Sequence, residues 1–397
     1  MRYDFDTVIK RYNCGSEKWE DLKKFGVTPE MDVMPMGNAE MEFPNAPEII
    51  EGLKEYLSKT VLAYYEYDLD HEYLETVSWW MKHRHDWDVS VESIVPCPGL
   101  HCGTPLAAQA FSKPGEGIIV MEPTWPGFFG SIRMPGMYRI TSPLFEENGR
   151  WYIDFDNLEE KASDPRNTML MFCSPQNPVS RVWSKEELEK VAEICLKHNV
   201  TILSDELHSD LTMPGFKHYS FASIDPEVAQ HSIICTAPSK SFNLAGLSTS
   251  NVIIPNSSMR ETYKNALKAN YIQGPNMLGI KACQFAYRRA EKWLDACVAK
   301  IESNAKFVND YLKNNLPMIS AAPFEATYLM WLDFRKLNVP HKKLEQDLIK
   351  AKVFFDAGYY FGKVGCEGYE RVNIACPTQA LKEALDRVAE YVNSLDL

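Results

Sequence analysis

The sequence predicts an α/β protein in which a large domain, with a mostly parallel sheet flanked by helices, is joined to a smaller α+β domain. Residues 168–206 carry the clearest signal, because a strand-like apolar run, a helical pattern and a second apolar run follow one another. This order is typical of a βαβ unit with parallel strands. Residues 233–236 form a further apolar run that indicates a buried strand. After about residue 312 short strand and helix patterns mix, as in an α+β domain.

The composition is that of an ordinary soluble globular protein. The chain has 397 residues and a formal net charge of −12. Because a net negative charge repels polyanions, nucleic acids and anionic membranes are disfavoured as partners. No apolar run is long enough to span a bilayer, and the first residues lack the apolar core of a signal peptide. We therefore expect a cytoplasmic protein.

Cysteine and histidine give no sign of a metal site. None of the ten cysteines forms a C-x-x-C pair, and Cys173, Cys195 and Cys235 stand inside apolar runs, where a reduced thiol packs as a small hydrophobe. His83 and His85 are two residues apart in a helical pattern, so they point to different faces, and no further ligand follows at metal spacing. We expect both histidines to lie at the surface.

The N-terminal segment has little periodicity up to about residue 45, and the spacing of apolar residues becomes helical after Pro47. Tyr64 stands in a group of tyrosines between this helix and a second one over about residues 74–81. Packing in a core or at an interface is one interpretation of such a group, and contact with a ligand is another.

A strand-to-helix junction at residues 93–104 contains Gly99, Leu100 and His101. The free N–H groups at the start of a helix, together with the positive end of its dipole, can bind an anion such as a phosphate. The same pattern also occurs in plain turns. It becomes informative only in combination with other residues.

The ends of the predicted strands carry three residues of interest. Trp125 follows the strand at residues 117–121 and could stack on a flat ring, although an aromatic residue between prolines is also typical of packing. Asn177 and Asp205 follow the two strands of the βαβ unit. Parallel sheets bind ligands at the C-terminal ends of their strands, so we expect these two residues at a site.

Lys240 is the candidate nucleophile. The strand at residues 233–236 is cut off by Ala237-Pro238, and Ser239-Lys240 comes directly after. A lysine at the end of a buried strand loses hydration, which lowers its pKa and lets the amine form a Schiff base with a carbonyl compound. Ser-Lys after a strand is also found at ordinary surfaces, so the neighbouring residues decide between the two readings.

The string Ala-Pro-Ser-Lys-Ser-Phe-Asn-Leu-Ala-Gly-Leu, residues 237–247, resembles the lysine segment of pyridoxal phosphate enzymes of the aspartate aminotransferase superfamily, and above all its cystathionine β-lyase, or C–S lyase, branch. The resemblance extends over essentially the whole chain. It implies that Lys240 binds pyridoxal 5′-phosphate covalently and acts as the catalytic base, and that Asp205 pairs with the pyridine nitrogen. The other cofactor contacts that it implies are Gly99, Leu100, His101, Trp125, Asn177, His208 and Ser239.

The resemblance also implies a partner and a substrate. Tyr64 is at the position from which a tyrosine reaches the cofactor phosphate of the second subunit in a homodimer. Arg371 is at the position that binds the α-carboxylate of an amino-acid substrate, beside Asn177. Gly37 and Asn38 stand in the substrate-bordering arm, where the branch usually has Trp-Val, so we expect a reshaped pocket for the group on sulfur.

The resemblance further implies three segments: an N-terminal arm (1–45) that belongs to the small domain, a large cofactor-binding domain (46–287) and a C-terminal small domain (288–397). We expect a C–S β-lyase that converts cystathionine or another S-substituted cysteine into pyruvate, ammonia and a thiol. The alternatives are an aminotransferase of aromatic or other amino acids and a regulatory or binding protein that keeps this fold.

Overall fold

The computed structural model describes residues 3–67 and 70–395. Its main element is a seven-stranded sheet with the order β2-β10-β9-β8-β7-β3-β4, and every neighbouring pair is parallel except those made by β10. The prediction of a mostly parallel sheet is confirmed. The strands are β2 (Ile94–Cys97), β3 (Gly117–Val120), β4 (Tyr138–Thr141), β7 (Asn167–Cys173), β8 (Thr201–Asp205), β9 (Ser232–Thr236) and β10 (Ser250–Ile253).

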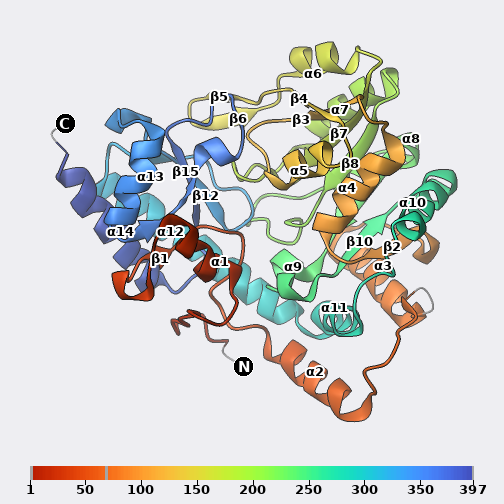
Figure 1. Cartoon of the computed structure of the whole chain (residues 1–397), viewed down its shortest axis with the longest axis horizontal. Helices are drawn as coiled ribbons and strands as arrows, with labels where there is room; N and C mark the ends of the chain where they lie inside the picture. Colours follow the sequence, from red (N-terminus) through yellow and green to blue (C-terminus); the bar gives the residue numbers. More distant parts are fainter. Residues whose placement is uncertain (1–2, 68–69, 396–397) are drawn as a thin grey trace.

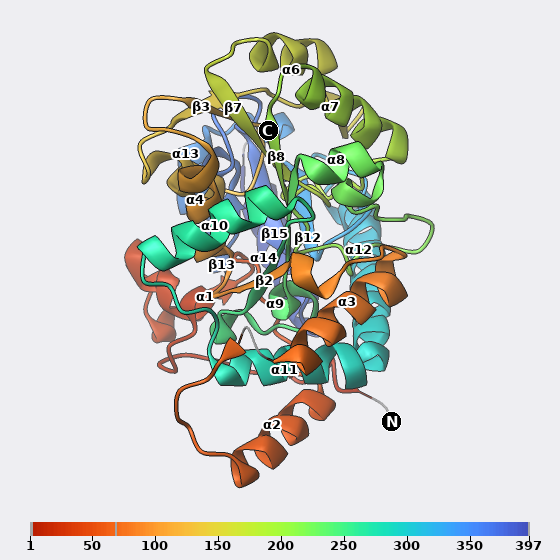
Figure 2. The same ribbon diagram turned by 90° about the vertical axis from the view of Figure 1, so that its right-hand side faces the viewer.

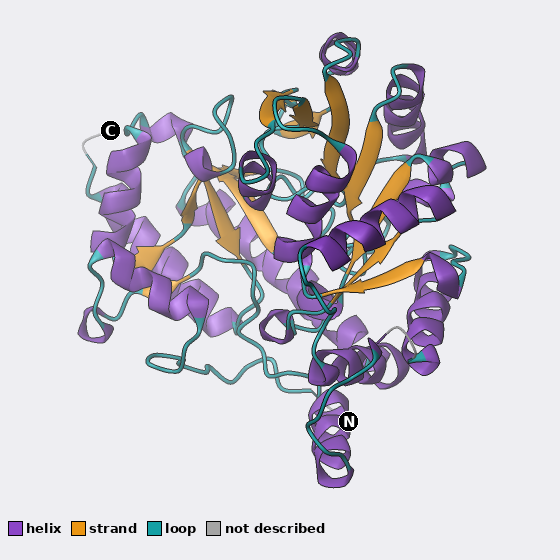
Figure 3. Ribbon diagram, turned by 45° about the vertical axis from the view of Figure 1, so that its right-hand side comes forward, coloured by secondary structure: helices purple, strands orange, loops and turns teal. Residues whose placement is uncertain are grey.

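Both faces of this sheet are buried, as expected for parallel strands. Along β7, Met169 and Met171 join one apolar cluster, whereas Leu170 and Phe172 join the other. The cluster of Met169 is completed by α4 (Leu100–Phe111), α5 (Gly127–Arg133) and α10 (Ser257–Ala269). That of Leu170 is completed by α3 (His71–His85), α6 (Phe155–Ala162), α7 (Lys185–Lys197), α8 (Pro226–Gln230) and α11 (Met277–Arg289). Helices therefore cover the sheet on both sides (Figures 2 and 3).

The predicted βαβ unit is β7-α7-β8. The Ser184 hydroxyl accepts a hydrogen bond from the Glu187 N–H, and the Glu187 carboxylate accepts one from the Ser184 N–H at 2.8 Å. This capping box satisfies two N–H groups at the start of α7. Leu188 and Val191 on the inner face of α7 are fully buried. The unit places the ends of β7 and β8 side by side at one edge of the sheet.

A second, four-stranded sheet has the order β11-β12-β15-β14 and is antiparallel throughout. Its strands are β11 (Ser320–Ala321), β12 (Leu329–Asp333), β14 (Asp356–Ala357) and β15 (Tyr369–Asn373). It lies with α12 (Glu291–Asn315), α13 (His341–Lys350) and α14 (Thr378–Asn393) on the side of the molecule away from α7 and α8 (Figure 1). β5 (Phe145–Glu147) and β6 (Arg150–Tyr152) form a separate hairpin.

The N-terminal segment joins the C-terminal part of the chain. β1 (Met34–Pro35) pairs in parallel with β13 (Val353–Phe354), after the short α1 (Glu17–Glu20). Figure 1 shows this red segment beside the blue elements, while α2 (Pro47–Lys59) extends at the lower edge of the molecule. The division into residues 1–45, 46–287 and 288–397 stays a prediction.

Two further observations complete the fold. The helical pattern from Leu278 to about Leu312 is two helices, α11 and α12, because the backbone leaves helical geometry at Ala290, where φ is −110° and ψ is 14°. The apolar spacing continues across this break, so periodicity alone could not locate it. Within residues 3–67 and 70–395, no helix is long and apolar enough to cross a membrane.

Candidate active site

The site lies where the large sheet meets the small one. Asp205 ends β8, Asn177 follows β7, and Lys240 stands on α9 (Pro238–Ser241) directly after β9. Arg371 comes from β15 of the other sheet and is buried with Asn177 and Asp205. Parallel strands end at the same edge, so the large sheet presents three polar side chains to the arginine.

Lys240 is partly buried, and its Nζ donates a hydrogen bond to the Ala39 carbonyl at 2.8 Å. Loss of hydration and the positive charge of Arg371 together lower the pKa of this amine to about 8, although the carboxylate of Asp205 opposes the shift. A lysine with this pKa supplies a neutral amine near neutral pH. A pKa this low differs from that of an exposed surface lysine, which titrates near 10.4.

Asp205 has the opposite shift. Burial raises the pKa of its carboxyl group to about 6, although the hydrogen bond from the Leu207 N–H and the charge of Lys240 oppose the rise. Among the described residues, only this N–H donates to the Asp205 carboxylate, at 3.1 Å. The carboxylate therefore keeps spare acceptor capacity, which a cationic nitrogen would satisfy.

His208 is buried, and its Nδ1 has no hydrogen-bond partner among the described residues. Burial holds the pKa of the imidazole well below its ordinary value. The ring packs edge-on against Tyr328 with 5.7 Å between centroids, and the Tyr328 hydroxyl donates to the Ala39 carbonyl at 2.9 Å. An unpaired nitrogen in a buried place calls for a partner, and the described residues do not provide one.

The start of α4 is the candidate anion site. Gly99 precedes the helix with φ of +78°, a conformation that strains residues with a side chain, and no side chain caps the helix there. Leu100 is buried, whereas the exposed His101 ring packs against the edge of Trp125 at 5.3 Å. Ser239 stands partly exposed on α9. The first turn of α4 thus keeps the features that favour an anion.

Arg371 is the centre of a polar cluster. Its Nε and Nη2 donate to Asp356 Oδ2 at 3.1 and 2.6 Å, and its Nη1 donates to Asn177 Oδ1 at 3.0 Å. The Asn38 N–H donates to the same Asp356 oxygen at 2.8 Å. The structure therefore brings Arg371, Asn177 and Asn38 together, and Asp356 with them.

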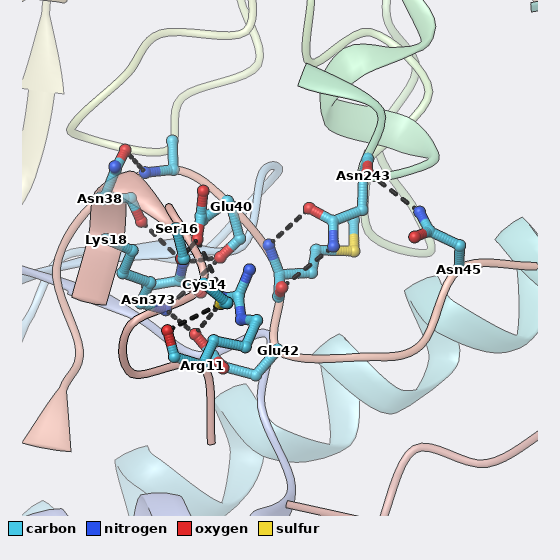
Figure 4. Close-up of polar contacts among 12 residues, drawn as sticks. Arg11, Cys14, Ser16, Lys18, Asn38, Glu40, Glu42, Asn45, Asn243 and Asn373 are labelled. Atoms are coloured by element: carbon cyan, nitrogen blue, oxygen red, sulfur yellow. Dashed lines mark hydrogen bonds and ion pairs between the residues drawn. The ribbon is translucent and has the colours of Figure 1, made fainter. Parts of the chain in front are cut away.

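The arm over residues 37–45 is held by polar contacts to Asn373 on β15 and to Asn243 (Figure 4). Asn373 donates from Nδ2 to the carbonyls of Asn38 and Glu40, both at 2.7 Å. Further along, Asn243 Oδ1 accepts from the Met41 N–H at 2.9 Å, and Asn243 Nδ2 donates back to the Met41 carbonyl at 3.0 Å. These paired bonds join the arm to the segment that follows Lys240.

Tyr64 lies elsewhere. Its side chain is fully exposed, in the segment between α2 and α3. Tyr64 lines a cavity of about 440 Å³ between residues 62–65 and residues 273–278. The structure of one chain does not bring Tyr64 to Lys240, which leaves its expected role in a partner's site as a prediction.

One prediction was wrong in part. His83 is exposed, but the His85 side chain is buried and its Nε2 lies 2.8 Å from Asp210 Oδ1. Asp210 also accepts from Trp80 Nε1 at 3.1 Å and from the Ser241 hydroxyl at 2.7 Å. The helical spacing placed the two histidines on different faces correctly, but the buried carboxylate that faces His85 comes from a distant part of the sequence.

Sequence reasoning also missed three groups at the site: the Ala39 carbonyl, Tyr328 and Asp356. A carbonyl leaves no signal in a sequence, and a tyrosine next to a predicted strand is typical of many cores. Asp356 did leave one, because an acidic residue directly after Val353-Phe354-Phe355 breaks an apolar run.

Residues 31–388 match the family described as aminotransferase class I and II, and the chain belongs to that family. It is 38% identical over 387 residues to the cystathionine beta-lyase PatB of Bacillus subtilis strain 168, with 97% of this chain and 98% of PatB covered. Protein MalY of Escherichia coli K12 is 30% identical over 398 residues, with 99% of each chain covered.

Solved structures give the same placement. Cystalysin from Treponema denticola, whose structure contains pyridoxal 5′-phosphate, superposes with a TM-score of 0.96 and 43% identity over 100% of both chains. A pyridoxal phosphate-bound C–S lyase from Staphylococcus hominis gives a TM-score of 0.91 and 28% identity, with 99% of this chain and 98% of that chain covered.

Proposed function

We propose that this protein is a pyridoxal phosphate-dependent C–S β-lyase that cleaves cystathionine or another S-substituted cysteine into pyruvate, ammonia and a thiol. The observation that carries the proposal is the combination of a lysine amine with lowered pKa and a buried carboxylate, at the ends of neighbouring strands, in a chain similar over its full length to a cystathionine beta-lyase.

The residues present fit the cofactor. The Asp205 carboxylate has acceptor capacity left for a protonated ring nitrogen, and His208 Nδ1 has no partner among the residues that the structure describes, so a ligand oxygen or a water could pair with it. Lys240 would bind the aldehyde carbon, and the start of α4, with Ser239, would hold the phosphate. Trp125 would cover the ring, and Asn177 would border it. Pyridoxal phosphate, when bound, supplies an acceptor for the electron pair released at Cα of the substrate.

The chain then has two tasks. Arg371 binds the substrate carboxylate through the N–H groups that Asp356 and Asn177 leave free, which fixes the orientation of Cα. Lys240, whose lowered pKa makes its neutral amine available, removes the Cα proton. Elimination follows when the thiolate departs from Cβ, and this step requires no second substrate.

We further propose a cytoplasmic homodimer in which Tyr64 reaches the phosphate site of the partner. The exposed apolar residues Val61 and Leu62 beside Tyr64 support an interface there, because side chains of this kind are usually covered. Enzymes of this family are generally dimeric. The ten free cysteines, eight of them buried, suit a reducing compartment.

The experiment is a product assay with the protein loaded with pyridoxal phosphate. L-Cystathionine without any keto acid should yield pyruvate, ammonia and homocysteine in equal amounts, and Lys240→Ala should reduce this rate by at least about 10³-fold. Turnover only in the presence of an added keto acid would instead identify an aminotransferase.

A further inference from the structure

Asp356 is the one carboxylate of the Arg371 cluster, which consists of Arg371, Asn177, Asn38 and Asp356. The proposed function gives this carboxylate no role of its own. The two residues face each other across β14 and β15. Asp356 Oδ2 accepts from Arg371 Nε, from Arg371 Nη2 and from the Asn38 N–H, which fixes the guanidinium and the arm to one oxygen. A buried guanidinium held at two of its nitrogens has little freedom to rotate.

The hydrogen bonds of Arg371 leave a defined pair of donors free. A guanidinium has about five N–H groups. Asp356 takes one from Nε and one from Nη2, and Asn177 takes one from Nη1. One N–H therefore remains on each terminal nitrogen, and both are available to a substrate carboxylate. Asp356 thus fixes the orientation of the Arg371 guanidinium.

The second oxygen of Asp356 lies against Gly37. A Cβ built on Gly37 would be 2.7 Å from Asp356 Oδ1 and 3.1 Å from Phe354 Cε1, so a larger residue could not occupy position 37 without displacing this carboxylate. Among the described residues no group donates to Oδ1, and the Asp356 side chain is 18% exposed. Because position 37 has no side chain, Asp356 Oδ1 keeps free acceptor capacity at the edge of the substrate site.

The charges of the cluster then bias what can bind. The Asp356 carboxylate already balances the Arg371 guanidinium before any substrate enters. Once the substrate carboxylate has bound, the cluster has an excess of negative charge. A second carboxylate on the substrate would add repulsion, whereas an ammonium group near Oδ1 would find an unpaired acceptor.

From this geometry we infer that Asp356 is a specificity-determining residue that selects thioether amino acids with an ammonium group on the sulfur substituent over those with a carboxylate there. This inference rests on the proposed lyase function for its substrate class. The position of Gly37 next to Asp356 Oδ1 is the feature that opens the site to such a group.

The test uses the protein loaded with pyridoxal phosphate and three carboxylic acids without a primary amine, so that none can form an imine with the cofactor. They are 3-(2-dimethylaminoethylthio)propanoate, 3-(propylthio)propanoate and 3,3′-thiodipropanoate, which end in a tertiary ammonium, a methyl and a carboxylate. Calorimetry should give the tightest binding for the ammonium compound, by about fivefold over the methyl compound, and the weakest for the diacid.

Asp356→Asn removes the charge but keeps an acceptor for Arg371, so this variant should bind the ammonium and methyl compounds equally. Asp310→Asn, at an exposed position of α12, is the control for the same change in net charge and should keep the preference of the unaltered protein. Melting curves check that both variants fold. The unaltered protein is a sufficient test without any variant. If it binds the diacid as tightly as the ammonium compound, or more tightly, the inference is overturned.

Turnover gives a second readout. The substrates are S-(2-aminoethyl)-L-cysteine and S-propyl-L-cysteine. For each of them, kcat/KM of the unaltered protein is divided by kcat/KM of Asp356→Asn. This ratio cancels the difference in leaving ability between the two thiols. kcat/KM should fall about fivefold more for the aminoethyl substrate. Elimination of both substrates with equal losses refutes the role of Asp356 and leaves the lyase intact. An absence of elimination with the calorimetric preference preserved refutes the lyase and supports the role of Asp356.

Discussion

At the scale of single residues, Lys240 sets the chemistry through its environment. Loss of hydration lowers the pKa of its amine to about 8, whereas an exposed lysine titrates near 10.4. The amine is therefore protonated below about pH 8 and neutral above it, so its nucleophilicity should rise through this pH.

We predict that in the cofactor-free protein the acylation of Lys240 by a small reagent rises with a midpoint near pH 8. Peptide mapping by mass spectrometry across pH 6–11 measures it, and the exposed Lys342 reports the reagent's own pH dependence. A midpoint near pH 10 for Lys240 would show that the side chain is hydrated and would remove the basis of its role.

The sequence could predict most of the candidate site at this scale, because Lys240, Asp205 and Asn177 stand directly after strands that their apolar runs reveal. It could not predict Asp356 as the partner of Arg371, or Tyr328 as the partner of Ala39. These contacts join segments up to 289 positions apart in the chain, and no local pattern records such a pairing.

At the scale of elements, α9 is held in place by the buried Asp210. Its carboxylate accepts from the Ser241 hydroxyl, which follows Lys240, and from Trp80 and His85 on α3. Burial alone would raise the pKa of Asp210, but the hydrogen bond and charge of His85 and the bond from Ser241 hold it below its ordinary value. Because folding lowers this pKa, the carboxylate stabilises the fold above about pH 4, and the contribution is lost as the pH falls.

We predict that Asp210→Ala lowers the free energy of unfolding by about 3 kcal/mol, since three buried donors lose their acceptor. Denaturant titration at pH 7 measures this loss. Asp310→Ala, at an exposed position within α12, is the matched control and should change stability by less than about 0.5 kcal/mol. Equal effects of the two substitutions would mean that Asp210 does not anchor α9.

The elements themselves were mostly predictable, since the capping box of α7 and the apolar runs of β7 and β9 are local signals. The order of the strands was not, because β10 enters the sheet antiparallel between β2 and β9. Its sequence, Ser-Asn-Val-Ile, carries no sign of direction. Strand direction depends on the course of the connections, which hydrophobic periodicity does not encode.

At the scale of the whole molecule, the proposed dimer makes each site depend on two chains. Mixing Tyr64→Phe with Lys240→Ala, each first shown to be inactive, would give hybrids with one doubly altered site and one intact site. A statistical mixture should regain about a quarter of the unaltered activity. Verified hybrids without activity would place Tyr64 outside the partner's site.

The distinction between elimination and amino-group transfer is the central claim, and the fate of the substrate nitrogen tests it most directly. L-Cystathionine labelled with ¹⁵N in its cysteinyl half is incubated with the loaded protein and an excess of a keto acid, and the nitrogen is followed by NMR. C–S lyase activity predicts that the label appears as free ammonium in the same amount as homocysteine. Label in the amino acid derived from the keto acid, with the thioether bond intact, would contradict it.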